Sequence, residues 1–431
     1  MSPKPLRNGT SGWLGRRTAR LKSLAVVGTV TLGMAGIGIA AAGPAAADPA
    51  TNYVAVGSDT IQDVMNGFSA GVSGGIIGSW DAVNPVTATA HEIITPAKAL
   101  AGGTFSSCSF TRPNGSTEGF NALDISAGGT ATGLASPPQA GCVDIARSSG
   151  GPGSVATTGP GSLNPAGQLV YVPFGVDAVT GATGPTTAGQ STTTKCLAAT
   201  AGCTNGLITF TVPVTVITQA DLFTKADLTA LYAGNTATEG GVTYWPKDST
   251  VVTQPPGSTV IDLYAPQPGS GTLKFWAAQL GFSATAPPVW VHQTIQAGPA
   301  NGVAVEEHDG SAYASDPNGY GPFSIAQFVA QSNGHNDRRH LAIIHSINGV
   351  APTVAGPALN PNFPILREVY NVVNFAAVTG GDPVLTGLLG GTGSRLCTST
   401  FTIKSFGFGT LPNAALPDAC GATPNANRVN M

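Results

Sequence analysis

Short glycine- and serine-rich loops follow strand-like runs at several points in this chain, and this recurrence constrains the fold most. The strand-like run Thr51–Gly57 leads into Ser58-Asp59-Thr60 and then into Ile61–Phe68, where apolar residues recur at helical spacing. Ser58 or Asp59 is suited to cap that helix. A strand, a polar turn and a helix N-terminus form a site for an anion or another polar ligand. An ordinary capped helix gives the same pattern.

Three further segments repeat this pattern. They are Phe110 to Leu123 with Arg112 and Ser116, the strand from Cys142 that ends in Arg147-Ser148-Ser149, and Val260–Tyr264 followed by Ser270-Gly271-Thr272 and the helix-like run Leu273–Leu280. Backbone N–H groups, hydroxyls and a guanidinium can bind one small anion, although solvated Gly/Ser loops are the alternative for each segment taken alone. Ligands in open α/β sheets lie at the carboxyl ends of strands. The four loops together predict an α/β fold in which they converge on a ligand crevice.

The first 47 residues have the organisation of a signal peptide. Six basic residues precede the uncharged apolar run Ser23–Ala42, and Ala45-Ala46-Ala47 supplies a small-residue cleavage site near Ala47. A retained membrane anchor is the alternative. Twin-arginine export through Arg16-Arg17 and Sec export stay open, and no cysteine near the site permits lipid anchoring. No later run reaches the roughly 18 apolar residues that a membrane span needs. We therefore expect a secreted, extracytoplasmic protein.

The remaining chain is acidic. Removal of the first 47 of 431 residues leaves 384 residues and removes six of the 19 basic residues but none of the 22 acidic ones, so the net charge becomes −9. This charge argues against nucleic acid or an anionic membrane as a partner. The length favours two domains over one.

The six cysteines all follow the predicted cleavage site, which fits an oxidising compartment. Their positions suggest three local disulfides, Cys108–Cys142, Cys196–Cys203 and Cys397–Cys420, among the fifteen pairings that six cysteines allow. With no Cys-x-x-Cys motif or Cys/His cluster, these are predicted to be structural.

Candidate catalytic and metal-binding residues are few. Ser69 fits the Gly-x-Ser-x-Gly pattern of hydrolases, but it falls at the end of a predicted helix rather than on a strand-to-helix turn, so we interpret the match as accidental. The run Glu306–Asp309 and the histidines His335, His340 and His345 match no established metal spacing and are interpreted as exposed polar residues. Without a nucleophile–base pair, we expect a binding protein rather than an enzyme, with no cofactor.

The order of elements predicts how the chain moves between domains. Gln168–Val179 is a long extended run that could pass from one domain to another, and residues 180–205 form a surface insertion closed by Cys196–Cys203. Gly321–Ala330 could carry the chain back, and Phe363–Val373 is strand-like. Thr215–Tyr232 contains a helix with Leu222, Leu228 and Leu231 inward, stopped by Gly234.

These motifs, in this order, resemble the periplasmic phosphate-binding proteins of ABC transporters. The loops Gly57-Ser-Asp-Thr60, Ala146-Arg-Ser-Ser149 and Gly269-Ser-Gly-Thr272 resemble the ligand loops of that family. Shorter similarities, which extend over nearly all of the mature chain, are Leu231–Gly234, Val172–Val176, Gly321–Gln327 and Phe406–Pro412. The order of Asp59, Arg112, Arg147-Ser-Ser149 and Asp337-Arg-Arg339 resembles the secreted actinobacterial branch.

The resemblance implies a type II periplasmic-binding-protein fold, with two α/β lobes, two crossover hinge strands and a ligand cleft between the lobes. Lobe 1 would comprise residues 48–171 and 321–431, and lobe 2 residues 172–320. The function implied is capture of inorganic phosphate or a similar small oxyanion for an ABC permease, by a monomer. The implied ligand contacts are Ser58, Asp59, Thr60, Ser116, Ser148, Ser149, Ser270, Gly271 and Thr272, joined by Arg112 and Arg147 as cations.

Two departures from the family affect the expected ligand. Pro266 stands where the family places an arginine, and Ser149 stands where it places the aspartate that accepts the proton of bound phosphate. Our hypothesis is that Arg147, with Arg112, supplies the cation, and that Asp59 becomes the acceptor and selects a protonated oxyanion. The absence of a lipidation cysteine leaves a second function open, a secreted cell-wall or adhesion protein that reuses the scaffold.

Overall fold

The computed structural model describes residues 51–85, 87, 89–99, 105–152, 167–185, 191–194, 208–211, 214–356 and 358–430. The predicted signal peptide, residues 1–47, and the predicted Cys196–Cys203 disulfide lie outside these residues. Among the described residues, no helix is both long and apolar enough to cross a membrane.

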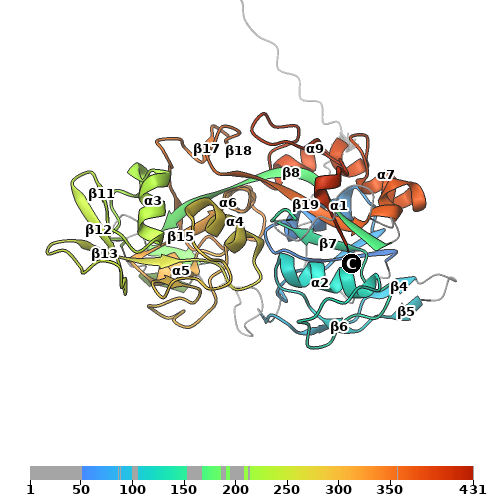
Figure 1. Ribbon diagram of the computed structural model, residues 1–431, viewed down its shortest axis with the longest axis horizontal. Coiled ribbons are helices and arrows are strands. Elements are labelled where there is room, and N and C mark those ends of the chain that lie inside the picture. Colours follow the sequence, from blue (N-terminus) through green and yellow to red (C-terminus); the bar gives the residue numbers. More distant parts are fainter. Residues whose placement is uncertain are drawn as a thin grey trace, which may run out of the picture. The chain divides into compact units, whose positions relative to one another are not determined.

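Two long antiparallel strands form the middle of the main sheet (Figure 1). β8 (Gln168–Thr183) is largely apolar, and all 16 of its residues are buried. A strand covered on both faces needs no polar/apolar alternation. It pairs with β19 (Leu366–Asn374), with a bulge between Val369 and Tyr370. The predicted extended run is confirmed. The assignment of residues 180–183 to a surface insertion, which was made from composition, is wrong, because these residues continue β8.

Within the described residues, the main sheet has 12 strands and mixed pairing. Its main path runs β11 (Ala237–Glu239), β12 (Val242–Pro246), β13 (Thr259–Tyr264), β15 (Gly319–Ser324), β8, β19, β7 (Ile145–Ser148), β1 (Tyr53–Gly57) and β2 (Ile77–Ser79). β14 (Val291–His292) pairs with β13, while β16 (Ile343–Ile344) and β20 (Arg428–Asn430) pair with β8. β7, β1 and β2 are parallel on one side of the β8–β19 pair, and β15, β13 and β12 are parallel on the other.

Four small antiparallel sheets accompany the main one: β3 (Ile93–Ile94) with β6 (Phe110–Thr111), β4 (Ala97–Ala99) with β5 (Phe105–Ser107), β9 (Ser191–Thr194) with β10 (Ile208–Thr211), and β17 (Thr353–Val354) with β18 (Ala358–Leu359). The α-helices are α1 (Gln62–Gly71), α2 (Ser116–Ser126), α3 (Lys225–Tyr232), α4 (Gly271–Leu280), α5 (Ser311–Ser315), α6 (Ile325–Ser332), α7 (Pro383–Leu389), α8 (Arg395–Thr398) and α9 (Thr400–Ser405). Single turns lie at Ala220–Leu222, Ala377–Gly381 and Asn425–Asn427.

α3 begins later than the spacing of its leucines predicts. Thr224 and Asp227 form a capping box, so the helix starts at Lys225. Leu222 therefore precedes the helix and is 47% exposed, and its predicted inward position is wrong. Leu228 and Leu231 are buried as predicted. Local capping thus overrides the apolar repeat at the helix start.

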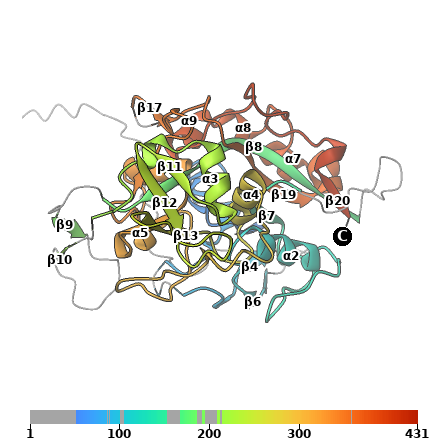
Figure 2. The same ribbon diagram turned by 60° about the vertical axis from the view of Figure 1, so that its left-hand side comes forward.

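The buried apolar side chains form separate clusters along β8. Val170, Val172 and Phe174 pack in one cluster with the apolar face of α1. Val176 and Val179 belong to another cluster with buried residues of α3 and α4, two helices that lie side by side in Figure 2. The mixed α/β fold with a large central sheet is confirmed, whereas the division into lobes at residues 172 and 321 stays a prediction.

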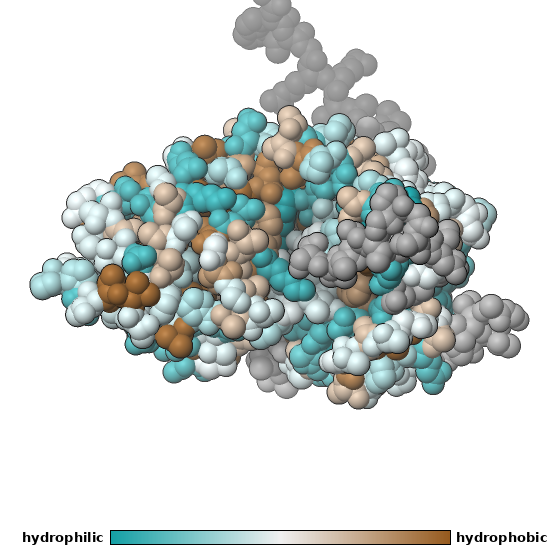
Figure 3. All heavy atoms as spheres, in the orientation of Figure 1, coloured by the Kyte–Doolittle hydropathy of each residue, from teal (hydrophilic) through white to brown (hydrophobic). Residues whose placement is uncertain are grey.

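Two of the predicted disulfides are present, Cys108–Cys142 and Cys397–Cys420. The first ties the segment before β6 to the segment before β7, so it links the strands that carry the second and third glycine–serine loops. On the face drawn in Figure 3, hydrophobic residues form small patches among hydrophilic ones. Scattered apolar side chains of this kind are normal on a protein surface and indicate no particular partner.

Candidate functional site

The first loop begins where β1 packs against β7 and α2. Gly57 has φ +108°, and a Cβ there would lie 2.8 Å from the Arg147 carbonyl oxygen and 3.0 Å from the Cα of Gly119. Only glycine fits this close approach. Ser58, Asp59 and Thr60 follow and are almost completely buried.

The second and third loops meet through a pair of serines. Ser116 is the first residue of α2, and its Oγ accepts a hydrogen bond from the Ser149 N–H (3.1 Å) and lies 3.3 Å from Ser149 Oγ. Ser148 turns away and donates to the carbonyl of Gly150 (2.7 Å). The structure thus brings Ser116 and Ser149 together and leaves Ser148 in a contact within its own loop.

The fourth loop packs directly on this serine pair. Ser270 caps α4 and accepts from the N–H groups of Thr272 and Leu273. A Cβ on Gly271 would lie 2.5 Å from Ser116 Oγ and 2.6 Å from Ser149 Oγ, so a glycine is required for the loops to touch.

The first loop also reaches the fourth. The hydroxyls of Thr60 and Thr272 are 3.5 Å apart. The N-terminal ends of α1, α2 and α4 therefore converge with the end of β7. Ser58 Oγ is buried near this convergence and has no hydrogen-bond partner among the described residues.

Glu307 lies against three of these hydroxyls, and the sequence interpretation missed it. Its carboxylate accepts hydrogen bonds from Thr60 Oγ1 (2.6 Å), Thr272 Oγ1 (2.7 Å) and Ser270 Oγ (3.2 Å to Oε2). We call the Thr60, Ser270 and Thr272 hydroxyls the hydroxyl cluster. Burial and the nearby carboxylate of Asp59 raise the pKa of Glu307 to about 7, although the hydroxyl hydrogen bonds oppose this shift.

His308, next in the chain, pairs with carboxylates on both ring nitrogens. Nδ1 lies 3.1 Å from Asp59 Oδ2 and Nε2 lies 3.3 Å from Glu306 Oε2. Burial and Arg338 disfavour the imidazolium, but the two carboxylates outweigh them and raise the pKa of His308 to about 9. Burial likewise opposes ionisation of Asp59, yet its ion pair with His308 lowers its pKa to about 2.

The interpretation of Glu306–Asp309 as exposed polar residues is therefore wrong for Glu307 and His308, which are fully buried. The sequence clue was four consecutive titratable residues in a chain with only 10% charged residues. The reason for the error is long-range: the partners of these side chains lie in the loops after β1 and β13.

A metal ion is a second possible use of this group. One ligand atom each from Asp59, Glu306 and His308 lies within 4.8 Å of the others. However, the imidazole presents a different nitrogen to each carboxylate, whereas one ion bonds to one ring nitrogen at a time. An imidazolium held between two carboxylates fits this geometry better, and we assign no metal here.

The His308 pairing predicts a loss of stability at alkaline pH. Because the folded pKa lies above the ordinary value of 6.5, the pair contributes fully below pH 6.5 and loses its contribution as pH rises through 9. We expect the wild type to lose roughly 2 to 3 kcal/mol more than His308→Gln between pH 7 and pH 10, by urea unfolding. The control is His91→Gln, which removes a half-exposed pair with Glu118. Equal losses in wild type and His308→Gln would contradict the assignment.

Arg147 is completely buried, and its donors are directed at the chain's own oxygens. Nε donates to Ser58 O (3.2 Å), Nη2 to Gly57 O (3.0 Å) and to Trp80 O, and Nη1 to Ser79 Oγ (2.8 Å). Burial lowers its pKa to about 10, so it stays charged at neutral pH. Its predicted role as the ligand's cation stays a prediction, and these contacts favour a structural role.

Arg112 occupies a similar position beside the site. It is buried, and its Nη1 donates to the carbonyl of Asp81 (2.8 Å). Its predicted contact with the ligand stays a prediction. Ser69 lies inside α1 rather than on a strand-to-helix turn, as the sequence predicted.

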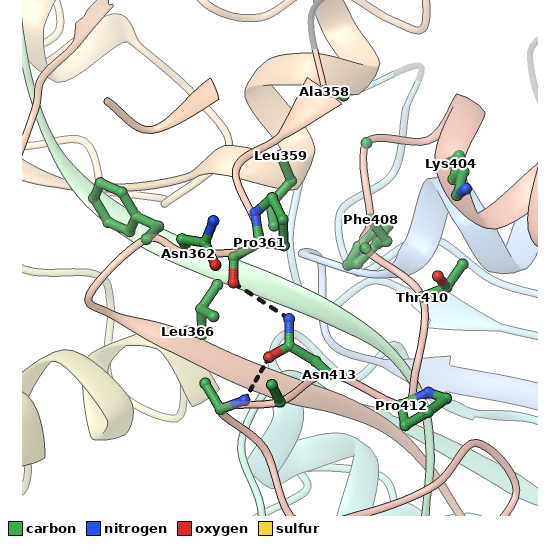
Figure 4. Close-up of a pocket in the computed structure, with 15 residues that line it drawn as sticks. Ala358, Leu359, Pro361, Asn362, Leu366, Lys404, Phe408, Thr410, Pro412 and Asn413 are labelled. Carbon is green, nitrogen blue, oxygen red and sulfur yellow. Dashed lines mark hydrogen bonds between the residues drawn. The ribbon is translucent and has the colours of Figure 1, made fainter. Parts of the chain in front are cut away.

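A groove elsewhere on the molecule has a different character (Figure 4). Its volume is about 720 Å³, and the segments Pro361–Phe363 and Gly407–Thr410 contribute to its walls. Asn413 fixes one side by donating to Pro361 O (3.4 Å) and accepting from Ala415 N (2.8 Å). Among the described residues that line the groove, Lys404 is the one that carries a charge, so these residues lack the convergent polar groups of the loop site.

No protein-family model matches the chain, and no curated protein matches it in sequence. Among solved structures, it is similar to a possible phosphate-binding protein from Planctomyces limnophilus, with 12% sequence identity and a TM-score of 0.34, over 85% of this chain and 94% of that one. It is also similar to a phosphate-binding protein from Stenotrophomonas maltophilia, with 15% identity and a TM-score of 0.31, over 87% of this chain and 96% of that one. With TM-scores this low, we infer nothing about function from either structure.

Proposed function

We propose that this chain is an extracytoplasmic solute-binding protein that captures inorganic phosphate or a similar small oxyanion and passes it to an ABC permease. The observation that carries the proposal is the convergence of four loops on buried hydroxyls. Thr60 meets Thr272, and Gly271 packs on Ser116 and Ser149. Loops that meet this closely in space, from positions far apart in sequence, fit a ligand site better than four independent surface turns.

The donors at this site suit an oxyanion. α2 and α4 begin at Ser116 and Gly271, so their N-termini face the convergence with positive dipole ends. Hydroxyls of Ser58, Ser116 and Ser149 add neutral donors. The carboxylate of Asp59 disfavours a fully ionised anion, so the preferred solute carries a proton that Asp59 can accept.

Two observations favour the second function, a secreted wall or adhesion protein on the same scaffold. Pro266 replaces an arginine expected near the fourth loop, and Glu307 already engages three hydroxyls of the site. A protein of this kind would bind none of the small oxyanions. The two functions are therefore separated by a binding measurement.

Replacement of Thr272 by valine tests the proposed site. Valine keeps the shape but removes the hydroxyl, and loss of a hydrogen bond to a charged ligand is expected to weaken phosphate binding by about 10- to 100-fold in isothermal titration. Thr238→Val is the matched control, because Thr238 is exposed on β11 and pairs only with Thr243 among the contacts described. Thermal unfolding of both variants establishes that each is folded.

Two results would oppose the proposal. If Thr272→Val binds phosphate as tightly as the wild type does, the solute does not bind at the hydroxyl cluster. Absence of binding by the wild type to phosphate, sulfate, phosphonate and arsenate at millimolar concentration would favour the adhesion function.

A further inference from the structure

Each hydroxyl of the hydroxyl cluster already donates its one hydrogen bond within the protein, so none is left for a solute. Each Ser or Thr hydroxyl donates one hydrogen bond only. The shortest acceptor distances of Thr60 and Thr272 are those to Glu307, 2.6 and 2.7 Å, against 3.5 Å between the two hydroxyls. Ser270 Oγ accepts from two N–H groups of α4, so its own proton also points to Glu307. One internal carboxylate thus receives all three donors.

A carboxylate at this position accepts hydrogen bonds in the same way as the proposed solute. It presents anionic oxygens to neutral hydroxyls, as a small oxyanion would. Resting on the proposed function, we propose that Glu307 is an internal competitor for the solute, and that an oxyanion binds the hydroxyl cluster only when Glu307 takes up a proton. A protonated Glu307 releases hydroxyl donors and gains an O–H that can itself donate to the anion.

The charges around Glu307 support this coupling. Asp59 faces it from the loop after β1, and the imidazolium of His308 follows it in its own segment. Tyr313 of α5 is buried within electrostatic reach of it, and Glu306 acts on the same histidine. Thr272 of α4 contributes a hydroxyl, and Gln327 of α6 contributes an amide that donates to Thr60 O.

Within this group, an oxyanion beside ionised Asp59 and ionised Glu307 would bring three negative charges together against one imidazolium. Neutralisation of Glu307 removes one of the two carboxylate charges that repel the oxyanion. Its pKa of about 7 places the required proton within reach at neutral pH.

The test compares phosphate binding by wild type, Glu307→Gln and Glu368→Gln at pH 6, 7 and 8. Glutamine keeps the size of Glu307 but cannot ionise. Glu368→Gln is the matched control, because Glu368 is also a buried carboxylate but contacts Tyr370 and Asp418 instead. Because all three proteins receive the same phosphate at each pH, titration of phosphate itself cancels in the ratio of affinities.

We expect Glu307→Gln to bind phosphate about tenfold more tightly than wild type at pH 8, and nearly equally at pH 6. Glu368→Gln should follow the wild type at every pH. Calorimetry of the wild type in two buffers of different ionisation enthalpy then measures the number of protons taken up for each phosphate bound. Phosphate takes up at most one proton when its dianion becomes the monoanion, so an uptake above one per phosphate at pH 8 assigns the excess to the protein.

The outcomes separate the two proposals. Suppose that the ratio of the phosphate affinities of Glu307→Gln and wild type is the same at all three pH values, and that the wild type takes up no more than one proton per phosphate. Glu307 is then not a competitor, and the proposed function stands. If none of the three folded proteins binds phosphate or sulfate, the proposed function is overturned and this inference with it. Binding by Glu307→Gln but not by wild type at pH 8 supports both. Should Glu307→Gln fail to fold, the wild-type proton count decides alone.

Discussion

Replacement of Arg147 by alanine is expected to lower the free energy of unfolding by about 3 to 5 kcal/mol, the range typical of breaking a buried charged network. The variant loses every hydrogen bond that the guanidinium makes to Gly57, Ser58, Ser79 and Trp80. The carbonyls that these bonds satisfied stay buried, and the removed side chain leaves a cavity. The unfolding midpoint in urea at pH 7 measures the change.

Two further variants sharpen this experiment. Arg147→Lys keeps the charge, but an ammonium cannot span acceptors on β1 and β2 as a planar guanidinium does, so we expect it to recover less than half of the loss. Arg395→Ala, at an exposed position in α8, is the control and should be near neutral. If Arg147→Ala unfolds like the wild type but no longer binds phosphate, Arg147 is the ligand's cation after all, as the sequence hypothesis holds.

A loss of similar size is expected for Asp177→Ala. Asp177 of β8 is completely buried, and its Oδ2 accepts from Arg367 Nη2 (2.6 Å) and Nε (3.1 Å). Its Oδ1 accepts from the N–H of Ala326 and the hydroxyl of Ser324 at the start of α6 (both 3.0 Å). One carboxylate therefore joins β8, β19 and α6, and its removal leaves a buried guanidinium without its counter-charge, at a cost of about 3 to 5 kcal/mol.

A double-mutant cycle tests whether this cost arises from the unpaired charge. Arg367→Met together with Asp177→Ala removes both charges, and we expect the double variant to be more stable than the sum of the single losses predicts, by more than about 1 kcal/mol. Asp177→Asn should lie between wild type and Asp177→Ala, because the amide can still accept from α6. Additive losses in the cycle would show that Asp177 and Arg367 act independently.

The sequence predicted the parts of this molecule that local chemistry determines. β1, β8 and β13 are apolar runs in the sequence, and the structure places their ends within a few residues of the predicted bounds. The meeting of loops was also predictable, because strands that are parallel neighbours, such as β1 and β7, end at the same edge of a sheet.

What could not be predicted depends on partners remote in sequence. Glutamate is a residue type that usually lies at the surface, and only the fold shows that the carboxylate of Glu307 meets Thr60, 247 residues earlier. The sequence hypothesis assigned Arg147 to the ligand, but nothing in the sequence distinguishes a guanidinium that faces a ligand from one that faces carbonyls of the neighbouring strands. Buried polar groups are specified by geometry rather than by residue type.

The same remoteness has a kinetic consequence. Thr60 contacts Glu307 and Gln327, which are 247 and 267 residues away along the chain. Contacts of such long sequence separation form slowly, since loop-closure entropy must be overcome before they stabilise the chain. A refolding chain should therefore regain helices and strands before it regains the hydroxyl cluster. The time at which the proposed solute binding reappears during refolding would then report the last stage of folding.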